Sequence, residues 1–179
     1  MGRLNDISLV TQVAVFHNRR AFDQLVREYQ SPVRRFFLGQ TRGDSQLSDD
    51  LAQDTFLKAY TSIGQFRGTS GFLTWLMRIA YNVYYDYRRS LRQTEDIDTT
   101  AVGLMGESHA SGSERMDINQ ALAVLREDER TCITLQLIDG YPIDQIAYIT
   151  GMPAGTVKSH LKRGKEKLAD YLRQNGYDR

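Results

Sequence analysis

The strongest constraint on the fold is a helical apolar pattern that begins at Phe72. Apolar side chains recur there at spacings of three and four: Phe72, Trp75, Leu76, Ile79, Ala80, Val83 and Tyr87. This spacing aligns them along one side of a helix of about five turns. Elsewhere, stretches that alternate apolar and polar residues are few, and only three of the 179 residues are proline. The sequence therefore predicts an all-α protein.

The other side of this predicted helix carries cations, an amide and a ring. Its residues are Arg78, Asn82, Tyr85, Arg88, Arg89 and Arg92, with Tyr81 and Tyr84 at the boundary. Seven of the eighteen aromatic residues lie between Phe66 and Tyr87. Rings beside arginines can stack unpaired bases, at about 1–3 kcal/mol each, while the cations hold phosphates. A core helix that ends in a solvated, arginine-rich segment is the other interpretation that this pattern allows.

Charge is balanced over the whole chain but not along it. The 23 basic and 22 acidic residues together indicate no class of partner. Residues 1–91 nevertheless contain twelve basic and eight acidic residues, a net charge of +4, and residues 154–167 contain five basic residues and one acid. We therefore expect two local basic surfaces, one in each half of the chain.

The single cysteine, Cys132, excludes an internal disulfide and any metal site with several cysteine ligands. Because it lies in an apolar pattern, we expect a buried core thiol rather than a redox sensor. No apolar run approaches the roughly 18 residues that span a membrane, and the amino terminus lacks the apolar region of a secretory signal. We therefore expect a cytoplasmic protein that is not inserted in the membrane and needs no metal or cofactor.

Three helices are expected before Phe66. The first is short, with Ile7, Val10, Val13 and Val15 on its apolar side. The second runs from about Arg19 to Gly39 and bends at Pro32. After a loop over residues 39–46, the third begins near Ser48, whose hydroxyl is expected to cap it. Its apolar side consists of Leu51, Ala52, Thr55, Phe56, Ala59 and Ile63.

The opposite side of the third helix mixes carboxylates, amides, a lysine and an exposed leucine. Its residues are Asp50, Gln53, Asp54, Leu57 and Lys58, with Leu47 just before them. Such a mixed face could dock a partner protein. Single exposed leucines are common, so an ordinary solvated face is the alternative.

A change of composition divides the chain into two units. Residues 93–115 are acidic, rich in Gly, Ser and Thr, and too poor in apolar residues to fold alone. We therefore predict an N-terminal helical domain over 1–92, a flexible linker over 93–115, and a C-terminal domain over 116–179. The C-terminal domain starts with an amphipathic helix around Leu122. A second helix follows, with Cys132, Ile133, Leu135, Leu137 and Ile138 in its apolar pattern and Gly140 at its end.

Residues 142–161 have the spacing of a helix-turn-helix. A short helix is followed by a turn at Gly151 and a longer helix whose Val157, Leu161 and Leu168 face inward. The second helix presents Thr156, Lys158, Ser159, His160, Lys162, Arg163 and Lys165 outward. Such a helix can enter the major groove of DNA, where Arg or Lys reads guanine edges. A structural helix pair with a solvated basic face is the alternative.

Three passages, in order, resemble the extracytoplasmic-function (ECF) group of the bacterial sigma-70 factors. DDLAQDTFLKAY at 49–60 is similar to the family's core-polymerase docking helix. FRGTSGFLTWLMRIAYNVYYDYRR at 66–89 is similar to its promoter-melting and −10 segment. GYPIDQIAYITGMPAGTVKSHLKRGKEKL at 140–168 is similar to its −35 helix-turn-helix. The resemblance covers nearly the whole chain and implies a transcription initiation subunit without catalysis of its own.

The resemblance also implies roles for individual residues. Contacts with the clamp helices of core RNA polymerase would come from Asp50, Gln53, Asp54, Leu57 and Lys58. Capture of a base flipped from the −10 element would involve Phe66, Arg67, Gly68, Thr69, Ser70 and Asn82. Arg88 and Arg89 would also bind the −10 DNA. The −35 duplex would be bound by Thr156, Lys158, Ser159, His160, Lys162 and Arg163. An inhibitory anti-sigma protein, often membrane-borne in this family, is a further expected partner.

Two positions depart from the family's usual pattern, and two other functions compete with this one. Gly164 stands where alanine is usual and His160 where arginine is usual, so we expect an unusual promoter sequence. A stand-alone helix-turn-helix regulator would bind duplex DNA without polymerase, but it leaves 49–60 and 66–89 unexplained. A small enzyme is disfavoured because the sequence has no nucleotide-binding loop, metal-ligand spacing or nucleophile motif.

Overall fold

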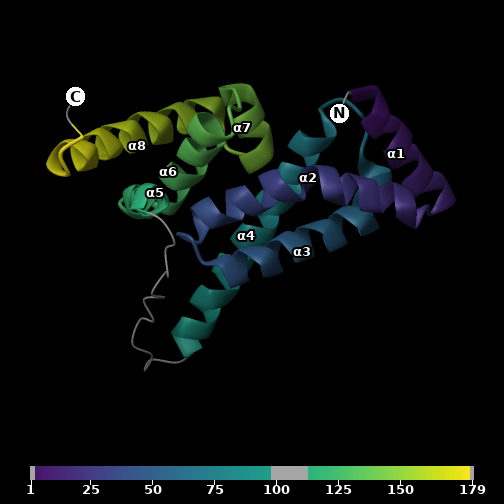
Figure 1. The fold of residues 1–179 in the computed structure, drawn as a ribbon, viewed down its shortest axis with the longest axis horizontal. Coiled ribbons are helices and arrows are strands. Elements are labelled where there is room, and N and C mark those ends of the chain that lie inside the picture. Colours follow the sequence, from purple (N-terminus) through teal and green to yellow (C-terminus); the bar gives the residue numbers. More distant parts are fainter. Residues whose placement is uncertain (1–2, 98–112, 178–179) are drawn as a thin grey trace. The chain divides into compact units, whose positions relative to one another are not determined.

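The computed structural model describes residues 3–97 and 113–177, and within these ranges the chain forms helices and turns (Figure 1). The all-α prediction is confirmed. Residues 98–112 of the predicted linker lie outside the described ranges. None of the helices in the described ranges is both long and apolar enough to cross a bilayer.

The first elements are α1 (Arg3–Phe16), α2 (Arg19–Gln40), α3 (Ser45–Ser62), the 3₁₀ turn η1 (Ile63–Gln65) and α4 (Phe72–Ile97). The later elements are α5 (Ser113–Ala123), α6 (Glu127–Ile133), the π-helical turn η2 (Thr134–Ile138), α7 (Ile143–Thr150) and α8 (Ala154–Gln174).

The chain forms two compact units. The described part of unit 1 comprises residues 3–34 and 49–97, and that of unit 2 comprises 35–48 and 113–177. Helices α2 and α3 each contribute residues to both units. Most of the predicted linker, 93–115, falls on residues outside the described ranges, so that domain boundary stays a prediction.

Helix α4 supplies much of the core of unit 1. The Phe72 ring lies 5.4 Å from Tyr29, 5.6 Å from Phe66 and 5.5 Å from Trp75, measured between ring centroids. Helix α1 packs against α4 and η1. Large aromatic rings bury much apolar area, and contacts of this kind add about 0.5–1.5 kcal/mol per pair. The side chains that α4 buries are Phe72, Thr74, Leu76, Met77, Ala80, Tyr81, Val83 and Tyr84.

The buried arc of α4 differs from the predicted one. Tyr81 and Tyr84 were expected at the boundary but are only 8% and 5% exposed. Trp75 and Tyr87 were expected inside but are half-buried. The buried arc is therefore rotated toward the side on which Met77, Tyr81 and Tyr84 lie at spacings of four and three. Periodicity alone does not show from which side a helix will be covered.

Helix α1 carries apolar residues on two sides, of which only one is buried. Leu9, Val10 and Val13 are buried, whereas the predicted core residues Ile7 and Val15 are exposed. A further polar contact anchors α1 to α2. The Tyr29 hydroxyl donates a hydrogen bond of 2.8 Å to the buried carboxylate of Asp6.

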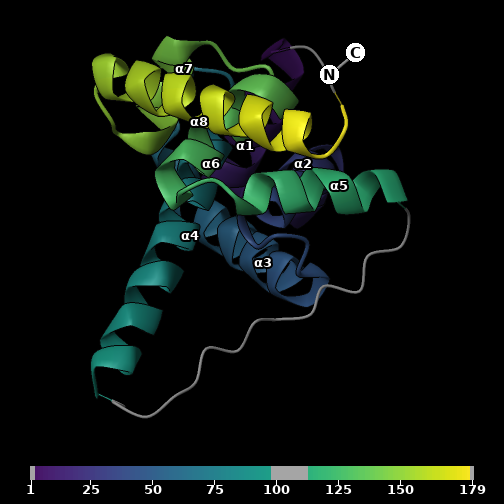
Figure 2. The ribbon, with the colours of Figure 1, turned by 90° about the vertical axis from the view of Figure 1, so that its left-hand side faces the viewer.

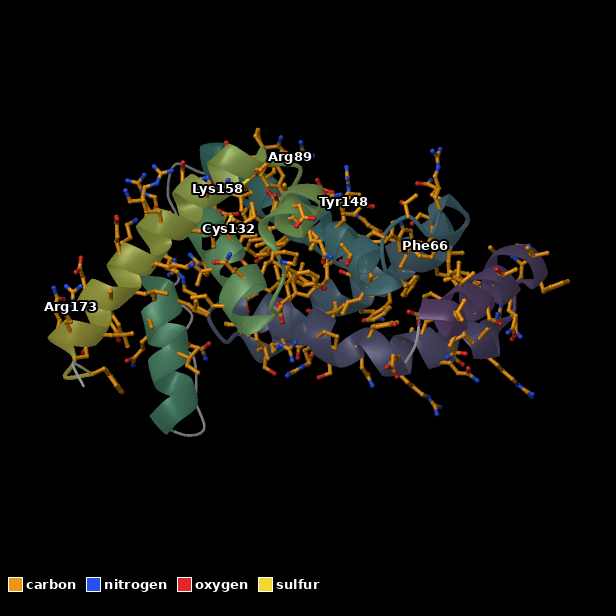
Figure 3. All side chains as sticks on the ribbon, turned by 90° about the horizontal axis from the view of Figure 1, so that it is seen from above. Phe66, Arg89, Cys132, Tyr148, Lys158 and Arg173 are labelled. Carbon is orange, nitrogen blue, oxygen red and sulfur yellow. The ribbon has the colours of Figure 1, made fainter. Side chains whose placement is uncertain are left out.

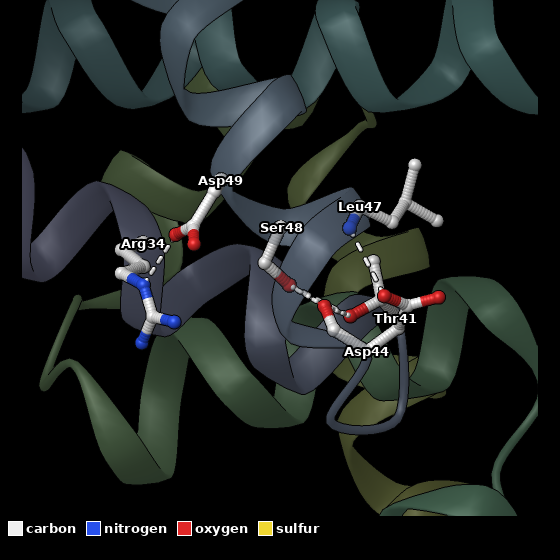
Figure 4. A network of polar contacts seen from close by, with 6 residues as sticks. All are labelled: Arg34, Thr41, Asp44, Leu47, Ser48 and Asp49. Atoms are coloured by element: carbon white, nitrogen blue, oxygen red, sulfur yellow. Dashed lines mark hydrogen bonds and ion pairs between the residues drawn. The ribbon is translucent and has the colours of Figure 1, made fainter. Parts of the chain in front are cut away.

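The turn between α2 and α3 is shorter than predicted because Asp44, not Ser48, caps α3 (Figure 4). The Asp44 carboxylate accepts a hydrogen bond of 3.0 Å from the Leu47 backbone N–H. An aspartate at this position offsets the unpaired N–H groups of the first helical turn. Ser48 is buried inside α3, where its hydroxyl donates to the Asp44 carbonyl and lies 2.8 Å from the Thr41 hydroxyl.

In unit 2, the guanidinium of Arg130 joins the ends of two helices. It is 5% exposed and donates to the carbonyls of Gln40 at 2.9 Å, Leu122 at 3.2 Å and Leu125 at 3.0 Å. Gln40 ends α2, and Leu122 lies in the last turn of α5. Carbonyls at helix C-termini lack intrahelical partners and carry partial negative charge, so a buried cation suits them. Thr131 adds a hydrogen bond of 3.0 Å to the Gln40 side chain.

The π-helical turn η2 changes which residues of its segment face the core. Cys132, Ile133 and Leu135 are buried as predicted, but Leu137 and Ile138 are 55% and 41% exposed. A π turn holds extra chain per turn and so shifts the phase of the helix. The apolar pattern was therefore right up to Leu135 and wrong beyond it.

Helices α6 and α8 cross closely at Gly164, which is buried. A Cβ at this position would lie 2.7 Å from Cγ1 of Ile133. One turn of α8 further on, Lys167 donates a hydrogen bond of 2.6 Å to the buried carboxylate of Glu129 on α6. Burial alone raises the pKa of Glu129, but the hydrogen bonds from Lys167 and the Arg126 backbone outweigh it and lower this pKa below its ordinary value.

We predict that Gly164→Ala lowers the free energy of unfolding by about 1–3 kcal/mol, because the new methyl group overpacks the crossing. Alanine favours a helix over glycine by about 1 kcal/mol, so the loss must come from Ile133. In an Ile133→Ala background, the same change should therefore be neutral or stabilising. Urea denaturation of the native chain, the two single variants and the double variant measures the coupling free energy between Gly164 and Ile133.

Gly155→Ala is the matched control, since a Cβ there meets nothing within 4 Å in the same helix. It should not destabilise the protein. If Gly164→Ala is no more harmful than Gly155→Ala, the close crossing of α6 and α8 is refuted.

The lowered pKa of Glu129 predicts an acid-sensitive contribution to stability. A carboxyl whose folded pKa lies below its unfolded value stabilises the protein above the unfolded pKa, and this stability is lost as pH falls through the folded pKa. The deficit of Glu129→Gln relative to the native chain should be full at pH 7 and shrink below about pH 4.5. Urea denaturation across that range tests this, and a deficit independent of pH would contradict it.

Candidate nucleic-acid interface

The predicted helix-turn-helix is present in unit 2 (Figure 2). Helices α7 and α8 pack together, burying Ile146 and Ile149 of the first against Val157 and Leu161 of the second. Between them, Gly151 has a left-handed φ of 74°, and its N–H donates a hydrogen bond of 2.8 Å to the Ala147 carbonyl. Glycine adopts this conformation without the steric penalty that other residues meet.

The face of α8 that the turn leaves uncovered is basic. Lys158 is exposed near the start of the helix (Figure 3). Ser159 and Arg163 lie on one ridge, where the Arg163 Nε donates to the Ser159 carbonyl at 3.3 Å. All but one of the predicted −35 residues are exposed: Thr156, Lys158, Ser159, Lys162 and Arg163.

Two positions of α8 are not fully exposed. His160 is half-buried, and its Nδ1 is buried without a hydrogen-bond partner in the described part of the chain. Part of its ring therefore faces the protein rather than the outer surface. Gly164 was expected to affect promoter choice, but it is buried against Ile133. Its small size is explained by helix packing.

The uncovered face of α4 combines an amide, a ring and cations. Arg78, Asn82, Tyr85 and Arg89 are exposed at successive spacings of four, three and four residues, which places them on one stripe. Tyr85 is 49% exposed, and its ring centroid lies 6.2 Å from that of the buried Tyr81. Arg88 is half-buried.

The aromatic surface is smaller than the sequence suggested. Three of the seven rings between Phe66 and Tyr87 are buried: Phe72, Tyr81 and Tyr84. Phe66 is half-buried in the loop after η1 (Figure 3). Its ring centroid lies 5.6 Å from that of Trp75. In this loop Arg67 and Thr69 are exposed, Ser70 is half-buried, and Gly68 has a left-handed φ of 69°.

The predicted docking face of α3 is exposed as one surface. Leu57 is 59% exposed, while Thr55 and Phe56 beside it are buried. The remaining members of that face are exposed as well: Asp50, Gln53, Asp54 and Lys58. Leu47, expected to be exposed, is half-buried.

Sequence reasoning missed one residue that touches two of these surfaces. Asp86 on α4 lies 3.4 Å from the Lys58 Nζ of α3 and 3.1 Å from an Nη of Arg89. Its signal in the sequence was a single acid between tyrosines and arginines, in YYDYRR.

Comparison with known proteins matches two successive parts of the chain to known families. Residues 25–94 match the family "Sigma-70 region 2", and residues 115–168 match "Sigma-70, region 4". The first match contains most of α2, all of α3 and most of α4. The second contains the helix-turn-helix.

Named relatives extend over most of the chain. The RNA polymerase sigma-H factor of Pseudomonas aeruginosa is 34% identical over 166 residues, covering 84% of this chain and 86% of the relative. The ECF RNA polymerase sigma-E factor of Haemophilus influenzae is 34% identical over 187 residues, covering 95% and 96%. The sigma factor RpoE of Bartonella quintana, solved with the anti-sigma factor NepR, is 27% identical with a TM-score of 0.73, covering 88% and 98%. The chain therefore belongs to the ECF group of the sigma-70 family, the sigma factors that direct transcription initiation by RNA polymerase.

Proposed function

We propose that this sigma factor divides promoter recognition between its two units. In this proposal α8 holds the −35 element as intact duplex, and the loop after η1 together with α4 holds one strand of the melted −10 element. The mixed face of α3 binds core RNA polymerase. The observation that carries the proposal is the exposure of Asn82 and Tyr85 beside arginines on α4, because a regulator that binds only duplex DNA needs no such surface.

The −35 contact is supported by the composition of the exposed ridge of α8. Arg163 and Lys158 can reach guanine edges in the major groove, whereas Thr156 at the start of the helix suits a phosphate. The Ser159 hydroxyl can form a hydrogen bond with either a base edge or a phosphate. Lys162 lies beside Arg163 and adds a phosphate contact, while the half-buried His160 takes a smaller part.

The −10 contact requires a base to leave the stack, which costs a few kcal/mol. The exposed amide of Asn82 can bond the edge of the extruded base, and Tyr85 offers a ring on which a neighbouring base can stack. Arg88 and Arg89 supply positive charge for the backbone. The loop residues proposed to close the base pocket are Phe66, Arg67, Gly68, Thr69 and Ser70.

The α3 face has the composition of a protein-protein interface with one apolar centre. Leu57 would insert into an apolar site on the clamp helices of the polymerase. Asp50, Gln53, Asp54 and Lys58 surround it with hydrogen-bonding groups, as the rim of such an interface does.

An anti-sigma factor is the proposed inhibitor. This rests on the similarity to RpoE of Bartonella quintana, whose structure was solved with the anti-sigma factor NepR. An inhibitor of this kind would cover one of the surfaces that polymerase or promoter needs. Promoter-specific runoff transcription should require both this chain and core polymerase; a promoter complex that forms equally well without core polymerase would contradict the proposed function.

We predict that Arg163→Ala and Asn82→Ala impair different steps. Arg163→Ala should weaken binding to a −35 duplex about 5- to 100-fold, the range expected for the loss of one good base contact. Asn82→Ala should leave duplex binding nearly unchanged but slow formation of the open complex. Fluorescence anisotropy measures the first effect, and permanganate reactivity of the −10 thymines measures the second. Equal effects of both variants on the duplex alone would refute the division.

We predict that Leu57→Ala weakens association with core polymerase by about tenfold, because a central apolar anchor typically contributes more than 1 kcal/mol. Its effect on stability should be small, since Leu57 is exposed. Phe16→Ala on α1 is the matched control, because Phe16 is an exposed apolar residue outside the proposed face. Titration of labelled core polymerase measures both. If the two variants bind equally well, α3 is not the docking surface.

A further inference from the structure

One carboxylate lies within the basic stripe of α4. Between Arg78 and Arg92, Asp86 is the only acidic residue. Its Oδ1 accepts a hydrogen bond of 3.1 Å from Arg89, one turn further along α4. Its Oδ2 accepts one of 3.4 Å from Lys58, on α3. Each oxygen of the carboxylate therefore has its own cation.

These contacts do little for the stability of the fold. The side chains of Asp86, Lys58 and Arg89 are 50%, 54% and 64% exposed. Ion pairs exposed to this degree stabilise proteins weakly, because water and salt screen them. The position of Asp86 calls for another explanation.

That explanation follows from where the two cations lie. Arg89 belongs to the proposed strand-binding face and Lys58 to the proposed polymerase face, so the two faces share one counter-ion. Asp86 follows Tyr85 directly and lies one turn beyond Asn82. A phosphate that approaches this stripe meets a negative charge at the point where Arg89 would bind it. The carboxylate and the phosphate are alternative anions for the same guanidinium.

We propose that Asp86 is a positioning residue that holds Arg89 and Lys58 in the free protein and competes with the phosphates of the single strand for Arg89. The inference rests on the proposed −10 function of α4. By this competition Asp86 lowers the affinity for single strands of any sequence. Tight binding then depends on the base that Asn82 holds. Phosphate contacts raise affinity for every sequence, whereas base contacts raise it for one.

The test uses holoenzyme assembled from the full chain and core polymerase. The probe is a fluorescein-labelled single strand of about 20 nucleotides and mixed sequence, followed by anisotropy from about 50 to 300 mM salt. Asp86→Asn removes the charge and keeps the shape. It should raise affinity about three- to tenfold at the lowest salt and steepen the log affinity against log salt plot by about 0.7, the value for one further cation on a single strand. Asp86→Glu should bind like the native chain.

Asp170→Asn is the matched control. Asp170 and Arg173 on α8 form an Asp–Arg pair with the same i,i+3 spacing, at 2.7 Å and with 63% and 59% exposure. Removing this acid changes the net charge equally but should leave the affinity for single strands unchanged. In an Arg89→Gln background, Asp86→Asn should have no more effect than this control.

An unchanged or reduced affinity of Asp86→Asn would overturn the inference. A reduction confined to strands with one particular base would show instead that Asp86 reads that base. The proposed function fails separately: if Arg89→Gln does not weaken strand binding, α4 is not the strand-binding helix. If Arg89→Gln weakens it and Asp86→Asn does not strengthen it, only the role of Asp86 is wrong.

Discussion

The packing of unit 2 depends on a buried cation, Arg130. Its guanidinium donates to the carbonyls of Gln40 at the end of α2 and of Leu122 and Leu125 around the end of α5. A planar fork can meet several acceptors at once, which a lysine ammonium on a single stem cannot do with the same geometry. Through this residue α6 is tied to the ends of α2 and α5. Helix α6 is in turn the surface against which α8 is packed.

The two proposed DNA surfaces follow different physical rules. The face of α8 is built from long cations on a rigid helix, and the turn at Gly151 sets how that helix is presented. Helix α4 buries three of its rings and exposes Asn82 and Tyr85 with arginines around them. Duplex recognition needs positively charged side chains that are long enough to reach into the groove. Capture of a strand needs a ring on which a base can stack, an amide that can bond its edge and a pocket that holds it. A single chain can meet both needs because each surface has its own supporting core.

Much of the fold was predictable from the sequence because periodicity and turn chemistry are local. The helix-turn-helix was found through Gly151 and its flanking apolar residues. The α3 cap was misassigned to Ser48 because Asp44 lies in a stretch that looked like loop, and both residue types cap helices well. The exposure of Leu137 followed from a π turn, for which the apolar pattern gives no sign.

The site was predictable where one helix presents it and less so where several helices meet. The exposed residues of α3 and α8 were largely placed correctly, since each lies opposite an apolar stripe. The burial of Tyr81 and Tyr84 depends on which neighbours cover α4. Gly164 was interpreted through its place in the DNA-binding segment, but its small size reflects the approach of Ile133 from another helix. Asp86 was missed because its two partners lie on different helices.

The environment of Cys132 has a practical consequence for experiments on this chain. Burial, with a smaller effect of Asp128, raises the pKa of its thiol to about 12. At neutral pH very few molecules therefore carry the reactive thiolate. Maleimide dyes should not react with the thiol of Cys132, and should react with a cysteine introduced on the surface. The natural sequence can thus serve directly as the background for fluorescence labelling.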